Sequence, residues 1–267
     1  MRFSRISQIC AIVVCCIIAT SIYAIDADPI LHFSFDELRL SFGEVPVNLL
    51  DANVVWEVTD ISTNDFDGNL TGGKWIDGVS GSAFEFNESA VTVDAIGINP
   101  DAFTIELWMK PAEQIDGGGR IDLVYRLNGG GRPHITFNRG GVLFGFYFGI
   151  RDGEEKEVVS NQDAWEAEWT HVAFVQDAEK AQIYVNGELD AEADTGGPAR
   201  FDFAEHGLSI AANQGGSNFF NGAIDEFRIW DIALSAEKVN EAMNLTPTAV
   251  DPAGKLTATW AAIKSAR

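Results

Sequence analysis

The feature that most restricts the fold of this chain is a series of short stretches in which apolar and polar residues alternate. They recur between residues 30 and 230, are separated by Gly, Asn and Asp, and show almost no helical periodicity between them. In residues 103–109, FTIELWM, one face carries Phe103, Ile105, Leu107 and Met109, and the other carries Thr104, Glu106 and Trp108. The pattern predicts an all-β chain with one domain over residues 25–245.

Three local signals refine this prediction. In residues 142–150, VLFGFYFGI, an aromatic row faces one side, while Gly145 and Gly149 thin the other, so a neighbouring group is expected to approach that side closely. Two strands within residues 169–190 lead into Asn186-Gly187, which favours a type I′ hairpin. Residues 234–244 have the pattern of one short helix near the C-terminus, with Ser235 as its N-cap.

The first 24 residues have the pattern of a secretory signal peptide. Arg2 and Arg5 precede the apolar run 9–19, and the segment ends at the small residue Ala24. An uncleaved anchor is the alternative, and no other segment is apolar enough to insert into a membrane. We therefore expect a secreted or cell-envelope protein. All three cysteines, Cys10, Cys15 and Cys16, lie in this leader, so the mature chain forms no disulfide.

The chain is strongly acidic. Loss of the leader removes two arginines and no acid, which takes the net charge from −22 to −24. Such a surface repels nucleic acids and anionic membranes, and it attracts divalent cations or simply keeps the protein soluble. We expect a monomer. Residues 246–267 differ in composition, with three basic residues and one acid, and form a linker or tail that either docks back through Leu256, Trp260 and Ile263 or stays disordered.

Six stretches carry a likeness to a known family. In chain order they are LHFSFDE, DISTNDFDGNLTGGKWIDGVSGSAFEFN, FTIELWMKP, WTHVAFV, IYVNGEL and FNGAIDEFRIWDIALSAEKV. Together they resemble the laminin G-like jelly-roll modules of the concanavalin A-like lectin and glucanase superfamily, from about Ile30 to Met243. The resemblance implies two antiparallel sheets packed face to face. Members of this superfamily bind glycans, mediate adhesion, accompany polysaccharide-degrading enzymes, or are themselves glycosidases.

One acid in the last predicted strand suggests a metal site. Simple alternation over residues 221–230 places Asp225 in the core-facing row with Ala223, Phe227 and Ile229, where a carboxylate needs a partner such as Arg, backbone donors or a metal. Many modules that this chain resembles hold a calcium ion between the first and last strands, and the matching positions are Asp36 and Asp225. Oxygen ligands suit calcium.

Residues 59–73 offer further oxygen ligands for such an ion. We expect Asp60 and Asn69 to complete a structural calcium site, the alternative being a turn-rich loop whose Asp and Asn side chains bond their own backbone. The register of an EF-hand fails in this loop, because Thr63 and Lys74 occupy its first and twelfth positions.

The sequence contains no recognisable catalytic set. The Glu-x-Asp-x-x-Glu pattern of the superfamily's glycosidases is absent. We therefore expect a non-catalytic binding module for a glycan or a cell-surface protein. The alternatives are a polysaccharide hydrolase or lyase with an unrecognised site, and a purely structural envelope or adhesion component. A sugar would stack on an exposed aromatic ring, and the candidate residues are Trp75, Tyr125, Tyr147 and Trp165.

Overall fold

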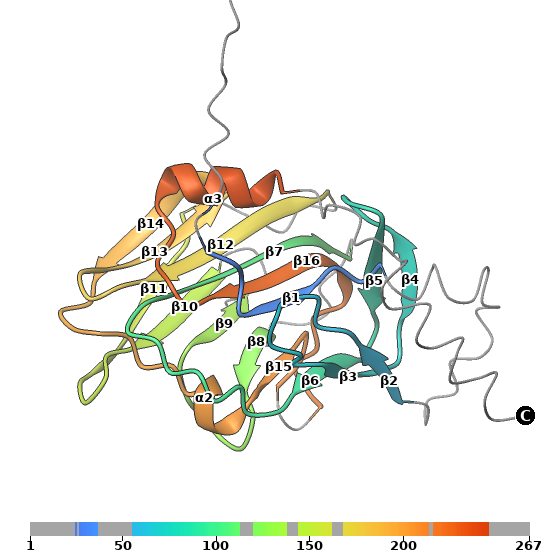
Figure 1. Ribbon diagram of the computed structural model, residues 1–267, viewed down its shortest axis with the longest axis horizontal. Coiled ribbons are helices and arrows are strands. Elements are labelled where there is room, and N and C mark those ends of the chain that lie inside the picture. The colour runs from blue at the N-terminus through green and yellow to red at the C-terminus, as the bar shows by residue number, and fades with distance from the viewer. Residues whose placement is uncertain are drawn as a thin grey trace, which may run out of the picture.

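The computed structural model describes residue 25 and residues 27–36, 55–112, 120–137, 144–161, 168–213 and 216–245. Within these ranges the chain forms sixteen strands and two short helices (Figure 1). The predicted signal peptide and the predicted tail lie outside the described residues, and so does Trp165. Neither described helix is long and apolar enough to cross a membrane.

The strands form two antiparallel sheets. Sheet A contains, in spatial order, β14 (Glu188–Asp194), β13 (Lys180–Val185), β12 (Thr170–Gln176), β7 (Phe103–Pro111), β16 (Gly222–Trp230), β5 (Ser82–Phe86) and β4 (Lys74–Asp77), with β1 (Leu31–Phe33) also paired to β16. Sheet B contains β11 (Glu155–Val159), β10 (Phe144–Gly149), β9 (His134–Phe137), β8 (Ile121–Arg126), β15 (Leu208–Ile210), β6 (Ala90–Val93), β3 (Gly68–Thr71) and β2 (Val55–Val58).

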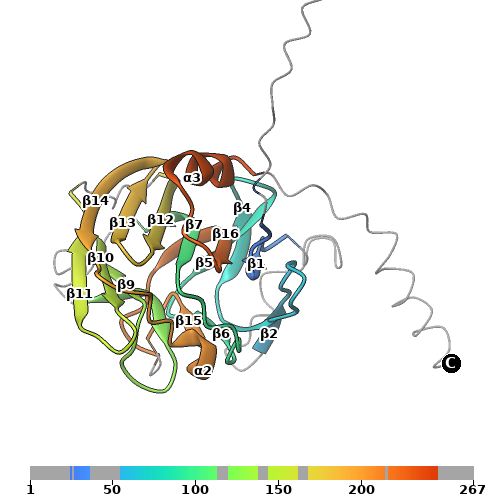
Figure 2. The ribbon, with the colours of Figure 1, turned by 60° about the vertical axis from the view of Figure 1, so that its left-hand side comes forward.

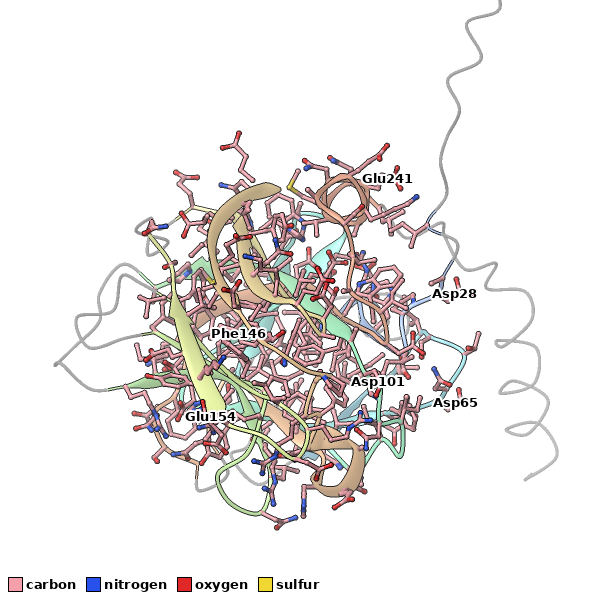
Figure 3. All side chains as sticks on the ribbon, turned by 90° about the vertical axis from the view of Figure 1, so that its left-hand side faces the viewer. Asp28, Asp65, Asp101, Phe146, Glu154 and Glu241 are labelled. Atoms are coloured by element: carbon pink, nitrogen blue, oxygen red, sulfur yellow. The ribbon has the colours of Figure 1, made fainter. Side chains whose placement is uncertain are left out.

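One hydrophobic core fills the space between the two sheets. The predicted row Phe103, Ile105, Leu107 and Met109 of β7 is buried there, opposite Phe144, Phe146 and Phe148 of β10. Phe146 is fully buried and Glu154 is exposed; both are labelled in Figure 3. The alternation of side chains along each strand produces this arrangement, because every second residue points inward. The predicted two-sheet jelly roll is confirmed.

The hairpin and helix predictions are also confirmed. Asn186 and Gly187 join β13 to β14 with positive φ angles of 50° and 80°, as a type I′ turn requires. Helix α3 (Ala236–Met243) begins after Ser235, whose side chain accepts a hydrogen bond from the Lys238 amide. A second helix, the four-residue α2 (Phe203–His206), was not predicted; Phe203 and Ala204 pack into the core.

Helix α3 covers the outer face of sheet A (Figures 1 and 2). Val239 and Ala242 of the helix pack with Val175, Tyr184 and Trp230 from three strands of that sheet. No described helix lies in the same way over sheet B, because α2 packs into the core instead. Among the described residues, a helix therefore covers the outer face of sheet A but not that of sheet B.

Candidate functional site

Strand β16 changes neighbours in its middle. Residues 222–224 pair with β5, whereas residues 227–229 pair with β1. Between these two pairings the register with β7 shifts, and Glu226 adopts a left-handed conformation with φ 51°. These are the marks of a β-bulge, which inserts one extra residue and changes the face to which the following side chains point.

The bulge corrects the predicted orientation of Asp225. Ile224, Phe227 and Ile229 point into the core, and Asp225 faces the other way, although it is fully buried. The prediction that Asp225 belongs to the core-facing row was wrong, because it assumed unbroken alternation through the bulge. The carboxylate still lies in a closed environment, because the turn between β4 and β5 covers it.

Asp225 and Asp36 meet at that turn. Asp225 Oδ2 accepts hydrogen bonds from the amides of Val79 and Ser80 at 2.8 and 3.0 Å. Asp36, which follows β1, accepts one from the Ser82 amide at 2.6 Å. Asp36, just after β1, and Asp225, in β16, thus each direct a carboxylate at the same six-residue segment, 77–82. These are the first and last strands in chain order. We call Asp36, Asp225 and this segment the carboxylate turn.

Two glycines make this close approach possible. A Cβ atom on Gly78 would lie 2.5 Å from Asp225 Oδ2, and a Cβ atom on Gly81 would collide with Asp36 Oδ1. Gly81 also has a φ of +63°, which residues with a side chain rarely adopt. Glycine at both positions therefore lets the backbone of the turn approach the two carboxylates.

Burial opposes ionisation of Asp225 in the carboxylate turn and of Glu226 beside it. Burial raises the pKa of Asp225 to about 7, with Glu226 and Asp36 adding to the rise against the pull of the two amide donors. Burial likewise raises the pKa of Glu226 to about 7. Among the described residues, the buried atoms Asp225 Oδ1 and Glu226 Oε1 have no hydrogen-bond partner. Closely set carboxylate oxygens with unused acceptor capacity suit a hard cation such as calcium.

The structure does not bring Asp60 and Asn69 to the carboxylate turn. Asp60 is fully buried, and its two oxygens accept from the amides of His32, Ser62 and Phe66 and from the Ser62 hydroxyl, at 2.7–2.9 Å. This is the turn interpretation of the loop. Asn69 is exposed on β3, opposite in direction to the core residue Leu70, and so lies on the outer face of the other sheet. Within the described ranges, no three His, Cys, Asp or Glu residues form a metal-binding group.

A buried ionic network adjoins the carboxylate turn beneath α3. Arg228 bonds Glu226 and Glu106, and it also donates to the carbonyls of Ala242 and Leu245 at the end of the helix. Burial opposes ionisation of Glu106, but His171 and Arg228 hold its pKa below the usual value. Sequence reasoning missed this network, although Glu106 was predicted to point away from the core. The register pairs Arg228 directly with Glu106 on β7.

The outer face of sheet B brings together two of the predicted aromatic residues. Tyr125 of β8 and Tyr147 of β10 lie on either side of His134 of β9. The Tyr125 ring meets His134 edge-on at 4.6 Å, and the Tyr147 ring stacks on it at 5.4 Å. Both tyrosines are half-buried, and their strand neighbours Val124, Phe146 and Phe148 point into the core. We call Tyr125, His134 and Tyr147 the tyrosine face.

Polar groups surround the tyrosine face. Asp122 accepts from His134, Arg120 and Asn218, and it is fully buried. Burial lowers the pKa of His134 despite this carboxylate, so the imidazole is neutral near pH 7. On the same side of the sheet, the buried hydroxyls of Thr136 and Ser209 lack a partner among the described residues. Partly exposed aromatic rings and buried polar groups thus lie side by side on neighbouring strands.

Charged side chains at the margin of this face are paired. Arg132 bonds Glu155 at 2.5 Å and lies over the Tyr147 ring at 5.8 Å from its centre. Arg200 bonds both Glu155 and Asp202 at 2.9 Å. Side chains of Arg132 and Arg200 also fill the space over Gly149, as the prediction of close packing there anticipated.

Of the remaining aromatic candidates, Trp75 lies elsewhere. It belongs to β4 of sheet A, its indole nitrogen donates to the Phe35 carbonyl at 3.1 Å, and its ring packs edge-on against Phe84. These contacts give Trp75 a packing role beside the core. Sequence reasoning did not single out His134, Asp122 or Arg132. Simple alternation through residues 121–126 would have placed Tyr125 in the core-facing row with Leu123. The register shift between Asp122 and Val124 turns Tyr125 to the outer face instead.

The sequence shows to which family the chain belongs. Residues 86–240, more than half of the chain, match the model of the concanavalin A-like lectin/glucanases superfamily. The chain belongs to this superfamily. The predicted resemblance to its laminin G-like members is therefore confirmed, and the match spans the strands from β6 to β16 and the first five residues of α3.

The chain is similar in sequence or in structure to several known proteins. The human adhesion G-protein coupled receptor D1 is 33% identical over 102 residues, which are 34% of this chain and 12% of the receptor. Domain 4 of an extracellular GH43 arabinanase from Geobacillus stearothermophilus, solved with arabinotriose, aligns with a TM-score of 0.59 and 23% identity over 81% of this chain and 98% of that domain. The botulinum neurotoxin serotype G binding domain gives 0.59 and 14% over 80% and 50%. This chain spans about an eighth of the receptor and half of the toxin domain.

Proposed function

We propose that the chain is an exported, non-catalytic module that binds a glycan on the tyrosine face and is stabilised by a calcium ion in the carboxylate turn. The observation that carries the proposal is the placement of the partly exposed rings of Tyr125 and Tyr147 on either side of the neutral His134, on the outer face of sheet B. The arabinanase domain with arabinotriose supports a sugar as ligand, and the receptor match supports a surface location.

The chemistry of this face suits a sugar. A pyranose ring has an apolar face, which stacks on aromatic rings, and a rim of hydroxyls, which need fixed donors and acceptors. Arg120 and Arg132 supply donors beside the rings, already oriented by their ion pairs with Asp122 and Glu155. Preorganised groups lose less conformational entropy on binding, so they favour affinity.

Calcium would act on the fold rather than on the ligand. Asp36 and Asp225 would hold the ion, and backbone carbonyls and water would complete its coordination. Because these residues lie on sheet A, whereas the tyrosine face lies on the outer side of sheet B, the ion would stabilise the pairing of β1, β5 and β16. It would supply no group to the sugar.

Glycan binding is tested by titrating a panel of polysaccharides into the protein and into Tyr147→Ala, Tyr125→Ala and Tyr147→Phe variants. Loss of either ring should weaken binding at least tenfold, about 1.4 kcal/mol or more. Tyr147→Phe keeps the ring and should retain most of the affinity. If no glycan binds, or if the alanine variants bind equally well, the tyrosine face is not a sugar site. Release of reducing or unsaturated ends would instead support the enzyme alternative.

A further inference from the structure

A groove on the far side of the molecule from the tyrosine face lies between the start of the described chain and α3. Its volume is about 860 Å³. One wall is formed by Ile25, Ala27 and Pro29, the floor by Trp230, and the other wall by the helix and the residues that follow it. Figure 3 shows Asp28 and Glu241, one on each wall, on the same side of the molecule.

We propose that the groove is the docking site of the chain's own C-terminal segment, residues 255–267. This site is separate from the tyrosine face and from the carboxylate turn, so it does not depend on the function proposed for either. Three observations point to this segment: where the chain leaves the domain, the spacing of its apolar residues, and its charge.

The described part of the chain ends at the groove. Leu245, the last described residue, itself lines the groove and is 42% exposed. Its carbonyl accepts a hydrogen bond from Arg228, and the Met243 carbonyl accepts one from Trp108, so the exit point is fixed to sheet A. Fourteen residues lie between Leu245 and Trp260. Extended, that length could reach ~50 Å, so the connection imposes no limit on docking.

The spacing of apolar residues in the segment suits a groove. Leu256, Trp260 and Ile263 stand at positions i, i+4 and i+7, which form one face of a helix. An isolated helix of this length is only marginally stable in water, and most helices gain their stability by packing an apolar face against a partner. An amphipathic helix laid in an apolar groove is a common mode of peptide recognition.

Charge favours the same pairing. The groove carries Asp28, Glu237 and Glu241, in keeping with the acidic domain. Residues 255–267 carry Lys255, Lys264 and Arg267 and no acid. Attraction between the two holds the basic segment near the groove and raises its effective concentration there.

The proposal is tested with a spin label and fluorinated tryptophan in the full chain. Cys10, Cys15 and Cys16 are replaced by serine, so that a cysteine introduced at Glu237 is the only labelling site. With 5-fluorotryptophan in place of tryptophan, the ¹⁹F resonance of Trp260 is assigned by its loss in Trp260→Phe. A nitroxide on Glu237→Cys should broaden that resonance strongly. A matched label on Val159→Cys, exposed on β11 of sheet B, should leave it sharp.

Further variants decide the occupant. Leu256→Ser with Ile263→Ser should restore a sharp Trp260 signal under the Glu237 label, since the docking face is lost. The same sharp signal in the unaltered segment would overturn the proposal. Equal broadening in a mixture of labelled, unfluorinated chains with fluorinated, unlabelled chains would also overturn it, because the groove would then hold the segment of a second copy.

Discussion

At the scale of single residues, the carboxylate turn depends on the absence of a side chain at its glycines. Gly81 has a left-handed backbone, and any side chain there would also strike Asp36. Gly97 has nearly the same φ, +69°, but no atom lies within 4 Å of the position of its Cβ. The pair separates backbone strain from the crowding of the carboxylate, because only Gly81 combines both.

Substitution of these two glycines by alanine gives the first prediction. Gly97→Ala should lower the free energy of unfolding by about 1 kcal/mol, the cost of a left-handed alanine. Gly81→Ala should cost clearly more and should also weaken the response of the melting temperature to calcium. Thermal unfolding with and without calcium measures both effects. Equal losses in the two variants would mean that Asp36 moves aside freely.

The raised pKa values at the carboxylate turn predict a pH dependence. Asp225 and Glu226 titrate near pH 7 in the folded chain and near pH 4 when unfolded, so the metal-free fold binds more protons than the unfolded chain between these values. Stability should therefore fall as the pH rises from about 4 to above 7. Calcium replaces those protons, so its stabilising effect should be larger at pH 8 than at pH 5.5.

The measurement is the melting temperature across this pH range, with excess calcium or with a chelator. Asp225→Asn is the control, because it keeps the shape of the side chain while removing its charge. It should flatten the pH dependence in part and abolish most of the calcium effect. A chelator that leaves the melting curve of the unaltered protein unchanged at pH 8 would contradict the calcium proposal.

At the scale of elements, α3 is held to sheet A by the buried ionic network as well as by apolar contact. Arg228 joins Glu106 and Glu226 to the carbonyls of Ala242 and Leu245. Its removal would leave two buried carboxylates without their cation, and an unpaired buried charge is costly. The exposed Lys180, which pairs with Glu192 and Asp194, offers a contrast.

We expect Arg228→Met to lower the free energy of unfolding by about 3–5 kcal/mol, the range for breaking a buried ion pair. Lys180→Met should change stability little, since water screens an exposed pair. Urea unfolding of both variants provides the comparison. Backbone amides in α3 should also exchange their hydrogens faster in the Arg228 variant. Unchanged exchange there would mean that the ionic network does not hold the helix on sheet A.

The elements also show how far sequence reasoning reached. Regular alternation in residues 103–109 and the Asn186-Gly187 pair predicted strands and a hairpin correctly, because both signals are local. The predicted alternation over residues 221–230 was wrong, because the bulge at Glu226 depends on the pairing with β7 and puts Asp225 on the opposite face. The pairing of Asp36 with Asp225 could be predicted from the family resemblance. The glycine turn between them, and the placement of Tyr125 beside Tyr147, could not, because they depend on contacts between strands that are distant in the sequence.

At the scale of the whole molecule, the strong negative net charge does not extend to the tyrosine face. The chain carries a net charge of −22, yet the arginines around the tyrosine face are balanced by Asp122, Glu155 and Asp202. A neutral glycan would therefore meet a locally neutral surface. An anionic polymer would be repelled by the rest of the protein.

This balance predicts the salt dependence of binding. Affinity for an uncharged polysaccharide should change less than about twofold between low and high ionic strength, because no net charge is neutralised on binding. Binding of a sulfated or uronate polymer should be absent at low salt. Calorimetric titration at two salt concentrations measures both. A steep loss of affinity with salt would instead indicate that free arginines bind an anionic ligand.

The meeting of the first and last strands has one more consequence. Because β1 lies beside β16, and because Ile25 and Leu245 line the same groove, the backbone arrives at and departs from neighbouring points on the surface. A unit with such closely spaced ends can be spliced into a loop of a host protein, or threaded repeatedly along a longer polypeptide, without unravelling its strands.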